Sequence, residues 1–534
     1  MKNTKHYKYK EYLAHTIPFI GHGIVTGLVV GVIIFFFKLI AEKLEEASHH
    51  IYEGAKGNPL QTVLIFLGLI GIASLMYLLH KKIPEVKGGG IPRSEGIMRG
   101  ILKLRWFPTF IGTLIGSLMS FFAGLPLGSE GPSVLIGTSV AHGLNPQKRG
   151  EATNREIMTG GACAGFAVAT GSPLTAILFV LEEVHRRITP SLLLIASSAA
   201  LCATGVNYAL CEIFEINPIL FDVGAVVELH LPQLGYVLLL TMIVAIAVNV
   251  FDAVVFHFQK FRDAHHSKIH PYVRLLFVFL LTGLVGIFFP EALFGGRGII
   301  LGILSGEKAL YVILLLLAWR ATMMIFTSAS GATGGIFVPT LAIGALVGAL
   351  SANLLVLIGM PEEFYGTMVL IAMCAFMGGS MRAPLTAAVF FIEATAQYTS
   401  VFYVAIVVFG VYFITNLFDR EAFYDLVLDG MEKAQHRGLK RRIIRFECKV
   451  SENAFIIGKP SRDILWPHSA VITGILRADK NRRAMDNDGE KKFYAGDTLF
   501  IRVQLYNEEY VTKYLYDLVG HDHEMVKTEI ELEG

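Results

Sequence analysis

The sequence predicts an all-α membrane domain built from two related halves, followed by a small α+β domain outside the membrane. Three observations predict this fold class. The 534 residues are 53% hydrophobic and only 17% charged, with a mean hydropathy of +0.55, which is more apolar than a soluble protein requires. Motifs that contain glycine and proline recur in the two halves, and the composition changes sharply near residue 439.

Apolar runs account for the membrane domain. Those that approach or exceed the ~20 residues needed to span a bilayer are 24–41, 62–80, 232–258, 272–289, 308–326 and 401–417. Other apolar stretches are rich in Gly, Ala and Ser, namely 109–124, 159–181, 191–210, 335–358 and 366–392. Small residues let helices approach closely in lipid. We therefore expect ten or more helices of uneven length, several of them broken or tilted.

Each half carries a glycine- and proline-containing motif inside apolar sequence. The first is GSEGPSVLIG at 128–137 and the second is GGIFVPTLAIG at 334–344, and in both a proline is followed four residues later by Ile-Gly. A second matched pair, Pro-Leu-Thr-Ala, follows at 173–176 and 384–387. Repeated halves with broken apolar helices are typical of transporters whose site lies at the interface between the repeats.

These motifs, and a third at 88–92 (GGGIP), predict unwound stretches that open helices, because glycine permits turns and proline suits a first helical turn. The free N–H groups and the positive dipole end of each helix would face the protein centre. Two or more such ends can bind an anion without a buried positive charge. The alternative is that glycine and proline only kink packed helices. Glu130 adds a carboxylate at one break, where the bilayer makes an acid expensive.

Other charged and reactive side chains have simpler explanations. We expect Glu182, Glu183 and Glu393, which end apolar helices, to cap neighbouring helices or face water, and Arg320 and Arg382 to satisfy such acids or backbone carbonyls. The five cysteines have no spacing typical of a metal site, so we expect no disulfide, metal or cofactor.

Basic residues flank the apolar region at both ends. They are Lys2, Lys5, Lys8 and Lys10 before it, and Lys433, Arg437, Lys440, Arg441, Arg442 and Arg445 after it. By the positive-inside rule both termini are expected in the cytoplasm. The predicted divisions are an amphipathic lead at 1–20, a membrane domain at 21–428, a linker at 429–438, a soluble domain at 439–520 and an acidic, disordered tail at 521–534.

The motifs GGGIP (88–92), GSEGP (128–132) and GGIFVP (334–339), with their flanking segments, resemble the signature sequences of the CLC chloride channel and transporter family. The resemblance covers roughly residues 20–428. It implies a multi-pass homodimer in a bacterial inner membrane, with one anion pathway and one inverted repeat in each subunit.

The resemblance also implies roles for single residues. Glu130 falls at the family's gating glutamate, whose carboxylate occupies an anion site when ionised and swings away when protonated. The backbone N–H groups of Ile336 and Phe337 match ligands of a central anion, and Tyr424 matches the tyrosine whose hydroxyl donates to that anion.

The N–H groups around Gly131 and Pro132 would belong to an outer site. The family's usual serine in the first motif is Gly89 here, so one hydroxyl ligand is absent and the choice among small anions is open.

An alignment through Phe221-Asp222-Val223-Gly224 places Asn217 where antiporters of the family carry an inner, proton-transferring glutamate. Asparagine cannot titrate. Glu215 and Glu212 lie close by in the sequence and are the candidates to replace that glutamate, although a helix-end acid facing water is the simpler interpretation of Glu215.

The soluble domain resembles the TrkA-C domain of potassium-transport regulators through the Gly458 turn, the 472–477 strand and the turn at 496–499. Such domains dimerise and can bind small ligands, including nucleotides; the alternative is a purely structural dimerisation module.

Transport of chloride or a similar anion is therefore the expected function, either coupled to protons in an antiporter or passive in a voltage- or pH-gated channel. A membrane-embedded enzyme has no supporting nucleophile–base pair or metal spacing. A sensor that binds ions without moving them is the third class. We expect no enzyme activity and no nucleic-acid partner.

Overall fold

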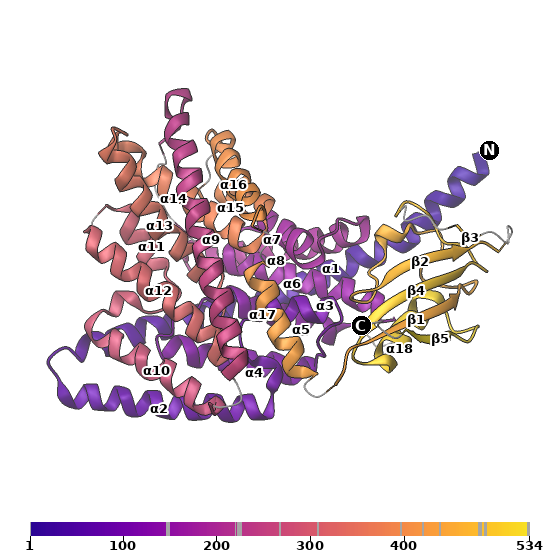
Figure 1. Ribbon diagram of the computed structural model, residues 1–534, viewed down its shortest axis with the longest axis horizontal. Coiled ribbons are helices and arrows are strands. Elements are labelled where there is room, and N and C mark those ends of the chain that lie inside the picture. The colour runs from indigo at the N-terminus through magenta and orange to yellow at the C-terminus, as the bar shows by residue number, and fades with distance from the viewer. Residues whose placement is uncertain are drawn as a thin grey trace.

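Apolar helices form the larger part of the molecule, and a separate five-stranded sheet forms most of the rest (Figure 1). The computed structural model describes residues 2–145, 150–218, 221, 227–265, 269–306, 309–395, 398–418, 421–436, 439–478, 483–484 and 489–530, and side chains from residue 17 on, except those of 263–265 and 483–484. Arg437, Gly438 and the Asp222-Val223-Gly224 segment used for the alignment lie outside the described residues.

The first half of the membrane domain contains α1 (Lys2–Gly54), α2 (Pro59–Lys82), α3 (Gly90–Met98), α4 (Trp106–Phe122), α5 (Glu130–Leu144), α6 (Glu151–Thr170), α7 (Pro173–Phe179), the π-helical turn η2 (Val180–His185) and α8 (Pro190–Ile213). The second half contains α9 (Leu234–His265), α10 (Pro271–Phe288), α11 (Arg297–Leu304), α12 (Leu310–Ser330), α13 (Phe337–Leu357), α14 (Tyr365–Met381), α15 (Pro384–Thr395), α16 (Val401–Asn416) and α17 (Phe423–Gln435). Short 3₁₀ turns lie at Pro84–Val86, Leu231–Gln233, Pro290–Ala292 and Glu362–Phe364.

Eight of the described helices are long and apolar enough to cross a membrane, and three shorter apolar helices accompany them. The outer faces of these helices are apolar: Leu64, Leu67 and Leu75 of α2 are each more than half exposed. Lipid is the surrounding that makes such faces favourable. The helix α1 runs without interruption from Lys2 through the lead expected at 1–20 and into the apolar span that follows.

The two halves run in opposite directions from the centre of the protein. Asn145, after α5, donates to Asn154 of α6 (3.1 Å), and the backbone N–H of Glu151 donates to Asp517 of the C-terminal domain (3.1 Å). Thus α5 ends on the side of the membrane that carries this domain, here called the domain side. In contrast α13 ends at Leu357, and the nearby Gly359 lies beside Tyr236 at the start of α9. The opposite end of α9 carries Arg262, which lies beside Gly430 of α17 on the domain side, so α13 ends on the far side.

Glycines allow the closest contacts between helices. A Cβ atom added to Gly137 of α5 would lie 2.0 Å from the carbonyl oxygen of Gly161 in α6, and one added to Gly165 would lie 2.2 Å from that of Ser133. Backbones pack directly at this crossing, as small residues permit in membranes. The position of α5 is therefore tied to that of α6.

The C-terminal domain is an antiparallel sheet with the strand order β3-β2-β4-β1-β5 and one helix packed against it. Its elements are β1 (Arg442–Lys449), β2 (Val471–Leu476), β3 (Arg483–Ala484), β4 (Thr498–Leu505), α18 (Glu508–Val519), β5 (Val526–Ile530) and a 3₁₀ turn at Ser461–Asp463. Side chains of β1 alternate: Ile444, Phe446 and Cys448 are buried beneath α18. The small α+β domain expected after the membrane domain is confirmed.

Two expectations near the ends of this domain are wrong. The tail after His521 is ordered over β5, where Phe446 pairs with Lys527 and Glu447 with Val526. The expected linker at 429–438 is helical up to Gln435, because α17 continues through it.

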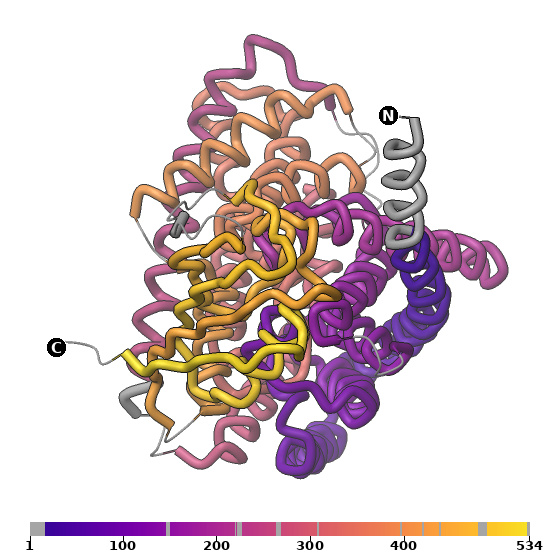
Figure 2. The backbone as a smooth tube through the Cα atoms, turned by 90° about the vertical axis from the view of Figure 1, so that its right-hand side faces the viewer, coloured from indigo at the N-terminus to yellow at the C-terminus, as the bar shows by residue number. Residues whose placement is uncertain are grey.

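The domain docks on the start of α6 and at the end of α17. Figure 2 shows it, in orange to yellow, in front of the helices of the membrane domain. Arg155 of α6 is 1% exposed; its guanidinium donates to the Tyr510 hydroxyl (2.9 Å) and lies over the Tyr514 ring (3.8 Å). Ala152 belongs to the apolar core of the domain. Two helices of the membrane domain, α6 and α17, are therefore in contact with the sheet domain.

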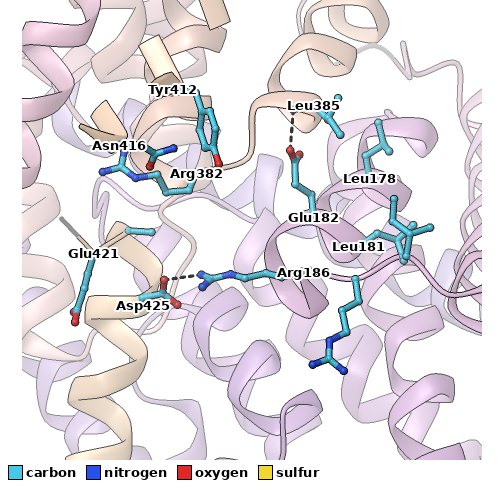
Figure 3. A pocket seen from close by; sticks show the side chains of 13 residues that line it. Leu178, Leu181, Glu182, Arg186, Arg382, Leu385, Tyr412, Asn416, Glu421 and Asp425 are labelled. Carbon is cyan, nitrogen blue, oxygen red and sulfur yellow. Dashed lines mark hydrogen bonds and ion pairs between the residues drawn. The ribbon is translucent and has the colours of Figure 1, made fainter. Parts of the chain in front are cut away.

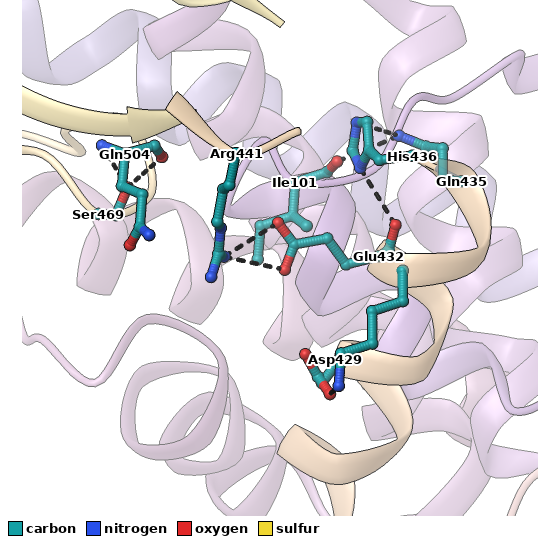
Figure 4. A network of polar contacts seen from close by, with 9 residues as sticks. Ile101, Asp429, Glu432, Gln435, His436, Arg441, Ser469 and Gln504 are labelled. Atoms are coloured by element: carbon teal, nitrogen blue, oxygen red, sulfur yellow. Dashed lines mark hydrogen bonds and ion pairs between the residues drawn. The ribbon is translucent and has the colours of Figure 1, made fainter. Parts of the chain in front are cut away.

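A polar network joins α17 to the neighbouring segments (Figure 4). Gln435 donates to the carbonyl oxygen of Ile101 (3.3 Å), and Arg441, just before β1, pairs with Glu432 (3.4 Å). These contacts hold the end of α17 between the α3–α4 connection and the sheet.

Candidate functional site

The two repeated motifs meet at the centre of the membrane domain. The N–H of Gly128 donates to the carbonyl oxygen of Gly335 (2.8 Å), and the N–H of Gly335 donates back to that of Gly128 (2.7 Å). Immediately after this two-bond bridge, α5 and α13 begin and run apart. Their first-turn N–H groups, which have no partners within their own helices, are therefore brought together as the sequence predicted.

A third helix start joins them. Gly89 is the N-cap of α3, and a Cβ atom added to Gly90 would lie 1.8 Å from the carbonyl oxygen of Gly131. The preceding Gly88 has a φ of +79° and donates its N–H to the carbonyl oxygen of Gly331 (2.9 Å). The close contact at Gly90 and the positive φ at Gly88 both favour glycine. Gly89 can contribute backbone groups to this centre but no hydroxyl.

Glu130 is the first residue of α5 and is 3% exposed. One carboxylate oxygen accepts from the Ser129 hydroxyl (3.4 Å), and the carboxylate interacts with the backbone of Val338 in the first turn of α13. The other oxygen has no hydrogen-bond partner among the described residues. The carboxylate thus lies where the dipole of α13 would also attract a free anion.

Tyr424, in the first turn of α17, is 0% exposed, and its hydroxyl has no partner among the described atoms. Its ring packs against Phe179 (6.5 Å between centroids), which in turn neighbours Phe337 (6.3 Å). An unpaired buried hydroxyl costs about 1–3 kcal/mol. A bound anion would accept that hydrogen bond.

The structure therefore assembles most of the predicted site residues. Those that lie at the converging helix starts are Gly89, Glu130, Gly131, Pro132, Ile336, Phe337 and Tyr424. Ile336 is the N-cap of α13 and Phe337 its first residue.

Asn217 and Glu215 are not brought to an inner position. Ser191, at the start of α8, donates to Glu156 near the docked domain (2.8 Å), so α8 starts on the domain side. Its 24 residues span about 36 Å, which places Glu215 and Asn217, both exposed, at the far side. Glu212 is exposed there too. The assignment of an inner proton-transfer position to these residues is wrong.

A different acid lies on the domain side of Tyr424. Glu183, in η2, is 1% exposed, and one of its carboxylate oxygens has no partner among the described atoms. Its charge interacts with that of Glu95, and Tyr424 interacts electrostatically with Glu183, Glu95 and Glu130. The expectation that Glu183 caps a neighbouring helix or faces water is therefore wrong. The available signal was an ionisable residue in an apolar run.

A cavity of about 650 Å³ lies on the domain side, beside η2 and α17 (Figure 3). Its lining includes Glu182, Arg186, Arg382, Tyr412 and Asp425. Arg186 pairs with Asp425 (2.5 Å), the residue after Tyr424. The cavity is therefore lined partly by polar groups, and it reaches Asp425, which adjoins the buried Tyr424.

The two Pro-Leu-Thr-Ala segments are capped reciprocally. Glu393 of α15 accepts from the N–H groups of Leu174 (2.9 Å) and Thr175 (2.7 Å) and from the Thr175 hydroxyl (2.6 Å). Glu182 makes the equivalent three bonds to the start of α15 (3.0, 2.8 and 2.8 Å). The expectation that these acids cap neighbouring helices is confirmed.

The expected role of the intramembrane arginines is confirmed as well. Arg320 donates to the carbonyl oxygens of Phe294 (2.5 Å) and Leu293 (2.9 Å), and Arg382 pairs with Asp252 (3.4 Å).

Comparisons with known proteins agree with this architecture. A family model described as "Voltage gated chloride channel" matches residues 70–416. The H(+)/Cl(-) exchange transporter ClcA of Salmonella paratyphi B is 29% identical over 376 residues, covering 69% of this chain and 78% of the relative. The ClcA protein of Salmonella newport matches with the same identity and coverage.

Solved structures share the fold. A slow cyanobacterial Cl−/H+ antiporter aligns with a TM-score of 0.71 and 24% identity, covering 78% of this chain and 99% of that one. A eukaryotic CLC transporter aligns with a TM-score of 0.65 and 20% identity, covering 79% of this chain and 75% of its own.

Proposed function

The chain belongs to the voltage-gated chloride channel (CLC) family, and on that premise we propose that it exchanges chloride for protons across a membrane. The relatives named above are H(+)/Cl(-) exchange transporters. The observation that carries the proposal is the position of Glu130: a buried carboxylate lies at the start of α13, among backbone N–H groups that suit a small anion. Carboxylate and chloride therefore compete for one place.

Protonation decides that competition. An ionised Glu130 occupies the place of an anion, whereas a neutral carboxyl gains little from the helix dipoles and yields to chloride. Each time chloride replaces the Glu130 carboxylate at this place, or the carboxylate replaces chloride, a proton moves onto or off Glu130. This step makes the flux of anions depend on protons.

A second titratable group is needed so that protons reach the buried centre from the domain side. We assign that role to Glu183. It is buried, it has a carboxylate oxygen without a partner, and it interacts with Tyr424, which also interacts with Glu130. The cavity beside η2 supplies polar surface up to this level.

The domain side is the cytoplasmic side in this proposal. Arg441, Arg442 and Arg445, which follow α17, lie there. In addition, α1 runs parallel to α8, since Gly23 faces Ser198 and Gly31 faces Val206. The start of α1 with its lysines is therefore on the same side, in keeping with the positive-inside rule. A homodimer in a bacterial inner membrane, and a TrkA-C-like C-terminal domain that binds a nucleotide, remain parts of the proposal that rest on sequence resemblance.

Variants in liposomes test the two carboxylates separately. Glu130→Gln is expected to carry chloride at a rate that no longer depends on pH and to move no protons. Glu183→Gln is expected to retain chloride flux and lose proton movement. Glu363→Gln, at an exposed position in the 3₁₀ turn Glu362–Phe364 away from this cavity, is the matched control and should behave as the parent protein. Proton uptake driven by a chloride gradient in Glu130→Gln would refute the assignment.

A further inference from the structure

One arginine, Arg99, holds the end of the turn that carries Glu183. Arg99 is the C-cap residue of α3, and its side chain is 17% exposed. Its Nε donates to the carbonyl oxygen of Val184 (2.8 Å), and a terminal nitrogen donates to that of Glu183 (3.1 Å). The planar guanidinium therefore binds two successive carbonyl oxygens of η2 as a fork.

These carbonyl oxygens need a donor from outside η2. The chain turns away after His185, because Arg186 has a φ of +51°. The N–H groups of Arg186 and Arg187 both donate to the carbonyl oxygen of Leu181, one turn earlier. A helix end leaves its last carbonyl groups without backbone donors, and basic side chains commonly bind them. Arg99 does so from a different helix.

The same guanidinium also faces two acids. It pairs with Glu95 of α3 (2.9 Å), which is 0% exposed, and at a longer distance with Asp425 of α17 (3.6 Å). A buried carboxylate without a nearby positive charge would be costly. Asp425 follows Tyr424 and lines the cavity. Arg99 therefore joins η2 to the helix that carries the central hydroxyl.

Other contacts hold the rest of η2. The Nε2 atom of His185 shares a hydrogen bond with the Thr159 hydroxyl of α6 (2.7 Å), and Arg187 donates to the carbonyl oxygen of Ile464 in the C-terminal domain (3.2 Å). Removing the Arg99 side chain should therefore leave η2 in place as a whole, while releasing the two carbonyl groups that the guanidinium binds.

We propose that Arg99 is a positioning residue for proton transfer: its fork fixes the backbone that carries Glu183, and so the place of the Glu183 carboxylate. This role rests on the proposed function, in which Glu183 passes protons to the buried centre. A side chain turns with its own backbone, so a shift at this helix end would carry the carboxylate away from Tyr424. Arg99 itself binds neither chloride nor the transferred proton in this role.

Chloride efflux and proton uptake, recorded together in liposomes that hold the full-length protein, test this role. Arg99→Met is expected to carry chloride but to take up protons about tenfold more slowly, because hydrogen bonds from a charged donor are lost. Arg99→Lys keeps the charge beside Glu95 but offers one ammonium group rather than a fork, so its proton rate should fall between. The proton-to-chloride ratio decides, since a loss of folded protein lowers both rates together.

Arg320→Met is the matched control, because it removes a buried arginine that also donates to two backbone carbonyl oxygens. Its proton-to-chloride ratio should equal that of the parent protein, and an equal fall in this control overturns the assignment to Arg99. A parental ratio in Arg99→Met or, where that variant does not fold, in Arg99→Lys overturns it too and leaves the proposed exchange standing. A parent protein that moves no protons refutes the exchange itself, and the role of Arg99 with it.

Discussion

Replacing Glu393 or Glu182 by glutamine should lower the free energy of unfolding by similar amounts, because each carboxylate joins a helix of one half to a helix start of the other. Each carboxylate accepts three hydrogen bonds, two from backbone N–H groups and one from a threonine hydroxyl, at distances of 2.6 to 3.0 Å. A hydrogen bond to a charged group contributes about 1.5–3 kcal/mol net. Glutamine keeps one acceptor oxygen and turns a donor toward the others, so at least one bond is lost at each site.

The expected loss is therefore about 2–3 kcal/mol of unfolding free energy for each single variant. The two caps lie at opposite ends of the α7–α15 pair and share no partner, so the double variant should lose about the sum. Unfolding by titration with a denaturing detergent, monitored by tryptophan fluorescence, measures this loss, with Glu421→Gln as a matched acid-to-amide control. Single variants as stable as the control, or a double variant no worse than either single one, would refute reciprocal capping.

Three further outcomes are expected. Tyr424→Phe should weaken chloride binding several-fold in calorimetric titration without lowering stability, because the hydroxyl has no protein partner to lose; unchanged affinity would count against a role in anion binding. Tyr510→Phe removes a partner of Arg155, whose other two guanidinium nitrogens already lack one, so amide hydrogen exchange at the start of α6 should accelerate. Asn217→Ala should leave proton coupling intact, because Asn217 lies on the far side. A loss of coupling in this variant would contradict that position.

The motifs at the centre were predictable because their chemistry is local. Glycine and proline specify a break and a helix start wherever they occur, so the sequence around Glu130 and Phe337 predicted two helix ends and their use as an anion site. It could not predict that Gly128 and Gly335 exchange two backbone hydrogen bonds, because that bridge joins segments far apart in the chain.

The error over Asn217 has a geometric origin. A short alignment compares residues but not sides of a membrane, and the 24-residue α8 carries the chain across to the far side before Asn217. The neighbouring acids Glu182 and Glu183 could not be separated by sequence either. The π-helical η2 changes the angle between successive side chains, so one acid caps α15 and the other points into the core.

Composition alone also misled at the C-terminus. The acidic residues after His521 suggested disorder. Residues 526–530 instead form the edge strand β5, which pairs with backbone groups of β1 that would otherwise be unpaired. The contact of Arg155 with Tyr510 joins residues 355 positions apart and has no local signal.

The most direct test of proton-coupled exchange is the reversal potential of the purified full-length protein in liposomes, measured under crossed chloride and pH gradients. Proton-coupled exchange predicts a reversal potential that departs from the chloride equilibrium value and shifts when the pH gradient alone is changed, with both effects lost in Glu130→Gln. A reversal potential that follows the chloride gradient alone in the parent protein would identify a passive channel and contradict the account.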